Sequence, residues 1–188
     1  MSTAPRAQSP ARPERHHVPS VVIVNTGHGK GKSTAGFGIA LRALARDWRV
    51  AVVQFIKSGR WRTGEEAMMG RLGADWWTLG DGFSWESEDL DASEALAVAA
   101  WEHTRGLLAA GEHELLLLDE ITYPMNWGWI DVDEVVAAVR DRAASTNVVC
   151  TGRDAPTALV DLADTVTEMR KVKHAYDRGI LARRGIEY

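Results

Sequence analysis

Eight residues near the amino end of the chain, "TGHGKGKS" (26–33), restrict its fold more than any other stretch. They lie between a short β-branched run, "VVIVN", and a run with helical spacing, "STAGFGIALRALARD". Glycines allow the backbone to bend so that several amide hydrogens point at one anion. The dipole of the following helix adds positive charge at the same place. A strand, a glycine-rich loop and a helix in this order predict a phosphate-binding loop.

Lys32 and Ser33 are the loop residues with the most specific chemistry. Lys32 can reach the β- and γ-phosphates of a nucleotide, and the Ser33 hydroxyl can ligate Mg²⁺. The pattern G-x-x-x-x-G-K-[ST] would begin with glycine at position 26, where this chain has Thr26. A merely structural glycine turn is the alternative, but strand, loop and helix agree on phosphate binding. The predicted nucleotide-binding residues of the loop are Gly27, His28, Gly29, Lys30, Gly31, Lys32, Ser33 and Thr34.

Strand and helix patterns alternate along the rest of the chain. Because the strands lack polar alternation and are joined by helices, we expect a mainly parallel sheet covered on both faces. The expected fold is therefore of the α/β class, a three-layer sandwich of the P-loop NTPase, RecA-like type. The predicted strands are 21–25, 50–56, 74–79, 114–120, 147–152 and 164–169. The predicted helices are 33–47, 63–73, one capped by Asp91 and ending at 108, one capped by Asp131 before 135–143, and 155–162.

The length, the net charge and the cysteine count limit the classes of protein to which the chain can belong. A chain of 188 residues suits one domain with a real core. Its net charge of −4 argues against a general nucleic-acid binder, which usually has a basic face. The single cysteine, Cys150, excludes an intrachain disulfide and a multi-thiolate metal site, and fits a cytoplasmic protein. No apolar stretch approaches the roughly 20 residues of a membrane span.

The first 20 residues differ from the remainder of the chain. They hold four of the six prolines and almost no large apolar side chain, so they cannot bury enough surface to offset their ordering entropy. We expect a flexible tail over 1–20 and a single domain over 21–188. The alternative for the tail is a segment that folds over a ligand.

Two carboxylates follow the most clearly buried strand, in "LLLLDE". Asp119 and Glu120 thus stand at the carboxyl end of that strand, where ligands bind in open α/β sheets. One or both should hold Mg²⁺, directly or through water. The alternative is a pair of solvated loop acids.

The loop and six further stretches together resemble the corrinoid adenosyltransferases, a P-loop family. "TGHGKGKST" is similar to the family's G-x-G-K-G-K-[ST]-[ST] loop, and the resemblance covers about residues 20 to 188 in one order. Three details depart from the family pattern: His28 stands where Asn is common, Ser33 where Thr is common, and "NWGW" follows the acidic strand. The other matching stretches are "VVQFIKSG" (52–59), "GFSWE" (82–86), "LLDEITY" (117–123), "TGRDAP" (151–156), "LADTVTEM" (162–169) and "VKHAYDRGILARRGIEY" (172–188).

The resemblance implies transfer of the 5′-deoxyadenosyl group of ATP to the Co(I) centre of a reduced corrinoid, in adenosylcobalamin biosynthesis or salvage. Because Co(I) is already a strong nucleophile, no general base is demanded and ATP hydrolysis should be slow. The departing triphosphate must be stabilised, which the loop amides, Lys30, Lys32 and Mg²⁺ would do. The alternative for Lys30 is a solvated loop residue.

Four residues outside the loop are further candidates for the site, and the resemblance implies roles for two of them, Phe83 and Trp85. Phe83 and Trp85 would lie against the lower face of the corrin, displacing the lower cobalt ligand; read alone, they would more often be core aromatics. Arg153 could pair with phosphate or a corrin amide, or be a surface arginine. Glu65 could reach the ribose hydroxyls, or simply begin a helix.

The resemblance also implies partners. A flavin-type reductase would supply the electron that produces Co(I), and the chain would form a homodimer. Neither nucleic acid nor a membrane is expected as a partner. A P-loop small-molecule kinase and a nucleotide-gated binding module remain as alternative functions.

Overall fold

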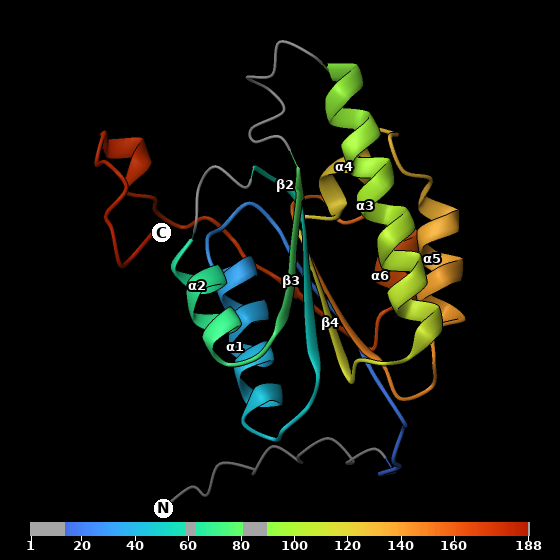
Figure 1. Ribbon diagram of the computed structural model, residues 1–188. Helices are drawn as coiled ribbons and strands as arrows, with labels where there is room; N and C mark the ends of the chain where they lie inside the picture. The colour runs from blue at the N-terminus through green and yellow to red at the C-terminus, as the bar shows by residue number, and fades with distance from the viewer. Residues whose placement is uncertain (1–13, 59–62, 81–89, 188) are drawn as a thin grey trace, which may run out of the picture.

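The computed structural model describes residues 14–58, 63–80 and 90–187, which form a three-layer α/β sandwich (Figure 1). Six parallel strands make one sheet in the order β3-β2-β4-β5-β1-β6. The strands are β1 (Val22–Thr26), β2 (Val50–Ser58), β3 (Asp75–Gly80), β4 (Leu115–Asp119), β5 (Asn147–Thr151) and β6 (Thr165–Glu168). The helices are α1 (Lys32–Leu44), α2 (Gly64–Arg71), α3 (Leu90–Ala110), α4 (Thr122–Asn126), α5 (Val132–Arg140), α6 (Thr157–Leu162) and the 3₁₀ helix η2 (Tyr176–Arg178).

The helices cover the two faces of the sheet unequally. Figure 1 shows α1 and α2 on one face and α3, α5 and α6 on the other. The apolar residues of β4 alternate accordingly, because successive strand residues point to opposite faces. Leu116 and Leu118 join the core under α3 and α5, whereas Leu115 and Leu117 join the core under α1. All six predicted strands and the parallel sheet are confirmed.

The strand order places β5 between the strand that enters the predicted loop and the strand that carries the acidic pair. Cys150 of β5 is the register partner of Val24 in β1 and of Leu118 in β4. The three strands therefore end at the same level, and their carboxyl ends form one edge of the sheet. Cys150 itself is fully buried, and burial raises the pKa of its thiol to about 12, so this cysteine is an unreactive core residue.

Two predictions about helix starts had different outcomes. Asp131 is the N-cap of α5, since its Oδ1 accepts a hydrogen bond from the Glu134 amide at 2.9 Å. Asp91 is not a cap: α3 already includes Leu90, so Asp91 lies in its first turn, where its charge still suits the helix dipole. The sequence patterns missed α4 and η2, which are too short for a helical period to be visible.

The last strand departs from the prediction of a sheet covered on both faces. All four residues of β6 are exposed, and β6 is an edge strand that pairs with β1. Of the predicted tail, residues 14–20 are described, and they contain neither helix nor strand. None of the described helices combines the length and apolar character needed to cross a lipid bilayer.

A glycine allows α1 to lie close to the sheet. A Cβ atom at Gly36 would come within 2.8 Å of the Leu117 Cδ1 atom and 3.3 Å of the Thr151 Cγ2 atom. A Cβ atom at Gly38, two residues further along the same helix, would meet nothing within 4 Å. Close packing of α1 against β4 and β5 therefore depends on the first glycine and not on the second.

We expect Gly36→Ala and Gly38→Ala to differ in the free energy of unfolding. Both gain about 1 kcal/mol of helix propensity, but Gly36→Ala also overpacks the core at a cost of about 1–3 kcal/mol. Urea denaturation should find Gly38→Ala more stable than the wild type, and Gly36→Ala less stable than Gly38→Ala by that overpacking cost. Equal stabilities of the two variants would contradict this account of the packing.

Candidate active site

The predicted phosphate-binding loop joins the end of β1 to the start of α1 and packs tightly against the end of β6. Gly27 and Gly31 have φ angles of 94° and 108°, a region that glycine enters without a steric penalty. A Cβ atom at Gly27 or Gly29 would come within 2.7 Å of the Met169 carbonyl oxygen. The Gly29 amide donates to that oxygen at 2.5 Å, and the Met169 amide donates to the Thr26 oxygen at 2.7 Å. Two glycines of this loop thus serve close approach to β6, and the Gly29 amide is bonded to protein.

Lys32, the first residue of α1, directly follows the loop glycine Gly31. Its Nζ atom donates to the Gly29 carbonyl oxygen at 2.8 Å. Burial lowers the pKa of the Lys32 ammonium, and the positive charge of Arg153 lowers it further. The negative charges of Glu120 and Asp119 act in the opposite direction. The charges of Arg153, Asp119 and Glu120 therefore all act on Lys32. These four residues were predicted separately from the sequence.

Asp119, the last residue of β4, is fully buried. Its Oδ1 atom accepts a hydrogen bond from the Thr151 hydroxyl at 2.7 Å, and its Oδ2 atom accepts one from Gln54 Nε2 at 3.0 Å. The next residue, Glu120, is partly buried and has a φ angle of 64°, which is uncommon for any residue but glycine. Its amide donates to the same Thr151 hydroxyl at 3.0 Å. The alternative of two solvated loop acids is therefore wrong for Asp119.

Gln54 and Thr151 are site residues that the sequence analysis missed. Each is a buried polar residue that directly follows a run of apolar residues, in "VAVVQFI" and "NVVCT". That contrast is the signal that could have found them, because a buried polar side chain requires a hydrogen-bonding partner. Which partner it finds depends on strand order, which the sequence pattern leaves open.

The segment that directly follows β5, residues 152–154, lies beside the loop. The Arg153 carbonyl oxygen accepts hydrogen bonds from the Thr122 hydroxyl at 2.6 Å and from Asn126 Nδ2 at 3.2 Å, which ties this segment to α4. The Arg153 side chain is exposed, at the predicted strand end. His28 of the loop pairs with Asp154 across the gap, with 3.1 Å between its Nε2 atom and the Asp154 Oδ1 atom. The segment after β5 and the loop are thus in direct contact.

Tyr123 of α4 lies near the acidic pair. Burial raises the pKa of its hydroxyl, and the negative charge of Glu120 raises it further. The hydroxyl therefore stays protonated at neutral pH, which makes it a hydrogen-bond donor at the edge of the site.

The remaining predicted residues have diverse positions. Ser33 and Thr34 stand in the first turn of α1, Ser33 partly buried and Thr34 exposed. Lys30 is exposed and forms an ion pair with Glu187 from the carboxyl end of the chain. Glu65 lies in the first turn of α2, a helix that Thr63 caps by accepting from the Glu66 amide at 3.2 Å; this is the helix-start alternative. Phe83 and Trp85 lie outside the described residues.

The donor atoms at this edge fit a hard cation. In the described ranges, no three His, Cys, Asp or Glu side chains gather into a metal-binding group. The Ser33 hydroxyl and the carboxylates of Asp119 and Glu120 are oxygen donors, and Mg²⁺ usually takes one or two carboxylates together with substrate phosphates and water. The residues present therefore fit Mg²⁺ that arrives with a nucleotide.

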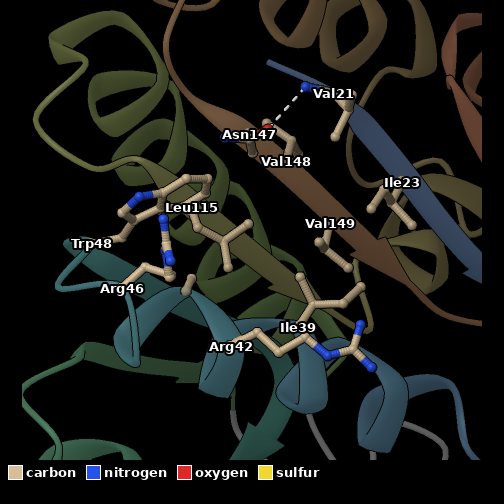
Figure 2. Close-up of a pocket in the computed structure, with 11 residues that line it drawn as sticks. Val21, Ile23, Ile39, Arg42, Arg46, Trp48, Leu115, Asn147, Val148 and Val149 are labelled. Carbon is tan, nitrogen blue, oxygen red and sulfur yellow. Dashed lines mark hydrogen bonds between the residues drawn. The ribbon is translucent and has the colours of Figure 1, made fainter. Parts of the chain in front are cut away.

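A pocket lies toward the opposite edge of the sheet (Figure 2). This pocket of about 280 Å³ is lined by Val21, which directly precedes β1, and by Leu115 and Asn147, the first residues of β4 and β5. Arg42 and Trp48 also line it. Because the loop and the acidic pair are at the carboxyl ends of the same strands, this pocket is separate from the candidate active site.

Comparisons with known proteins identify relatives over almost the whole chain. A family model described as "ATP:corrinoid adenosyltransferase BtuR/CobO/CobP" matches residues 19–188. The chain is 41% identical over 168 residues to corrinoid adenosyltransferase CobA of Salmonella typhimurium, covering 89% of this chain and 85% of that protein. It is 43% identical over 180 residues to a corrinoid adenosyltransferase of Pseudomonas aeruginosa, covering 95% of this chain and 86% of that protein.

A likeness to solved structures supports the fold alone. The flagellar accessory protein FlaH from Methanocaldococcus jannaschii superimposes with a TM-score of 0.52 at 16% identity, over 80% of this chain and 71% of that chain. The family match, in contrast, includes the phosphate-binding loop, the acidic strand and the segment that carries Arg153. From this match and from the identity of its relatives, the chain belongs to the ATP:corrinoid adenosyltransferase family.

Proposed function

We propose that this protein transfers the 5′-deoxyadenosyl group of ATP to the cobalt of a reduced corrinoid and releases tripolyphosphate. The observation that carries the proposal is the site itself in a member of this family: a glycine-rich loop that ends in Lys32 and an acidic pair lie at the same edge of one sheet, at the carboxyl ends of β1 and β4. The loop and the acidic pair together fit a nucleoside triphosphate and the cation that binds with it.

The proposed reaction is a displacement at the ribose 5′-carbon. Co(I) of the corrinoid, as substrate, donates an electron pair to form the cobalt–carbon bond. The carbon–oxygen bond to the α-phosphate breaks, and its electron pair leaves with the triphosphate. No proton is transferred, so the protein needs no general base. Its task is to stabilise the growing negative charge on the leaving group.

Two lysines would stabilise the leaving triphosphate, and each has another partner in this structure. Lys32 donates to the Gly29 carbonyl oxygen, and Lys30 pairs with Glu187. We propose that both exchange these partners for phosphate oxygens when ATP binds. A cation held by Ser33 and the acidic pair would neutralise further charge on the phosphates.

The finer assignments extend the same proposal. Phe83 and Trp85 would contact the lower face of the corrin and help to displace the lower cobalt ligand, and Arg153 would contact phosphate or a corrin amide. A flavin-type reductase would supply the electron that gives Co(I). We also propose that the protein is a cytoplasmic homodimer that takes part in adenosylcobalamin biosynthesis or salvage.

The first prediction from the proposed function concerns the products of the reaction. With ATP, Mg²⁺ and a corrinoid reduced under anaerobic conditions, we expect a light-sensitive cobalt–carbon product and one tripolyphosphate per corrinoid. Visible spectra before and after illumination and chromatography of the phosphates measure both. Formation of ADP with a phosphorylated acceptor would instead identify a kinase, and nucleotide binding without any product would identify a binding module.

The second prediction concerns Lys32. Because its surroundings lower the pKa of its ammonium, the neutral variant Lys32→Met should unfold no more readily than the wild type without nucleotide. With ATP at 100 times its dissociation constant, the wild type should gain about 2.7 kcal/mol of stability. We expect thermal unfolding to find this gain lost in Lys32→Met.

Lys171→Met is the matched control, because Lys171 is an exposed lysine that pairs with Asp177. It should keep the full stabilisation by ATP. A full ATP effect in Lys32→Met would contradict the role of Lys32 at the phosphates.

The third prediction concerns the aromatic pair. If Phe83 and Trp85 displace the lower ligand, alanine at either position should slow product formation from Co(II) corrinoid and a mild reductant by about tenfold, or about 1.4 kcal/mol of barrier. A corrinoid already reduced to Co(I) should show a smaller loss. Trp48→Ala, which removes an exposed tryptophan at the opposite edge, is the control and should show neither effect. Equal losses with both cobalt states would argue against ligand displacement.

A further inference from the structure

We propose that Thr151 and Gln54 are positioning residues that set the Mg²⁺ dependence of nucleotide binding through the acidic pair. The proposal rests on the proposed function, which gives Asp119 and Glu120 their cation. It assigns a role to two residues of strands β5 and β2 that flank the acidic strand and need not touch the nucleotide.

The Asp119 carboxylate has both oxygens bonded to neighbouring strands. It is fully buried, so its charge is tolerated only where hydrogen-bond donors replace water. Gln54 is its register partner in β2 and donates from Nε2 to Oδ2 at 3.0 Å. Thr151 donates from the other side, from β5, to Oδ1 at 2.7 Å. Two bonds from opposite directions fix the rotation of the carboxylate about its own axis.

Thr151 also holds the residue that follows. Its hydroxyl accepts the Glu120 amide at 3.0 Å while it donates to Asp119. Glu120 has a φ angle of 64°, a conformation that persists in a non-glycine residue only where the surroundings enforce it. One hydroxyl therefore orients the first carboxylate and fixes the backbone direction from which the second one starts.

The two acids differ in how far they are exposed to solvent. Asp119, without exposed surface, is held in place by the sheet, whereas Glu120 is partly exposed at the edge where the loop lies. Groups that orient metal-binding carboxylates typically contribute about 10–100-fold to metal affinity. Removal of the Thr151 hydroxyl should therefore weaken the cation's contribution by a factor in that range.

The test compares nucleotide binding with and without the cation. Isothermal titration of ATP, without corrinoid so that no transfer occurs, gives the half-saturating Mg²⁺ concentration and the affinity in EDTA. We expect Thr151→Val to raise the half-saturating Mg²⁺ concentration by about 10–100-fold, with the affinity in EDTA near the wild-type value. Thr151→Ser keeps the hydroxyl and should restore the wild-type Mg²⁺ dependence.

Thr146→Val is a matched control just before the amino-terminal end of the same strand. Thr146 is fully buried, and its hydroxyl donates to the His113 carbonyl oxygen at 2.9 Å. It directly precedes β5, at the edge opposite the loop. This variant should lose thermal stability much as Thr151→Val does, and keep the wild-type Mg²⁺ dependence. Gln54→Leu serves as a second variant in the event that Thr151→Val does not fold, and it should also raise the Mg²⁺ requirement.

The outcomes separate this proposal from the proposed function. If Thr151→Val and Gln54→Leu lose stability but bind ATP with the wild-type Mg²⁺ dependence, the two residues are structural and the positioning role is wrong. The role is also wrong if affinity falls equally in Mg²⁺ and in EDTA, or if wild-type binding does not depend on Mg²⁺ at all. If instead the proposed function is wrong, the wild-type protein will form no adenosylated corrinoid in the product assay.

Discussion

The arrangement of this site depends on one buried carboxylate. Transferring a carboxylate from water into an apolar sheet costs several kcal/mol unless hydrogen bonds replace its hydration. Asp119 is tolerated because β4 lies between β2 and β5, each of which carries a polar side chain at the right level. The same strand order inserts β5 between β1 and β4. The loop and the acidic pair thus stand two strand spacings apart, about 10 Å, which is room for a phosphate chain and its cation.

The parts of the fold that are local in sequence could be predicted, and the parts that depend on register could not. Each of the six strands is a short stretch that can be recognised from its own residues, and the Asp131 cap is a contact between residues three positions apart. Gln54 and Asp119 are 65 residues apart, and Thr151 and Asp119 are 32 apart. Periodicity identifies each strand without ordering them, so it cannot pair these side chains. The acidic pair was therefore predicted, whereas the residues that hold it were not.

The phosphate loop illustrates a second limit of the pattern. Its glycines are explained from the sequence by amides that point at an anion. The structure adds another reason, since Gly27 and Gly29 allow the loop to touch the Met169 carbonyl oxygen, about 140 residues further along the chain. A pattern that spans eight residues contains no information about that contact. The chemistry of the loop could be derived from its own residues, but its support by β6 could not.

Thr151 connects the two halves of the site through the two arms of its branched side chain. Its hydroxyl bonds to Asp119 and to the Glu120 amide, while its methyl carbon lies 3.3 Å from the point where a Cβ atom of Gly36 in α1 would be. Helix α1 thus packs close to the same side chain that orients the acidic pair. Valine would keep this packing without the alignment, and serine would keep the alignment without the methyl contact. Because threonine supplies both the hydroxyl and the methyl group, neither valine nor serine can reproduce all the contacts of this residue of β5.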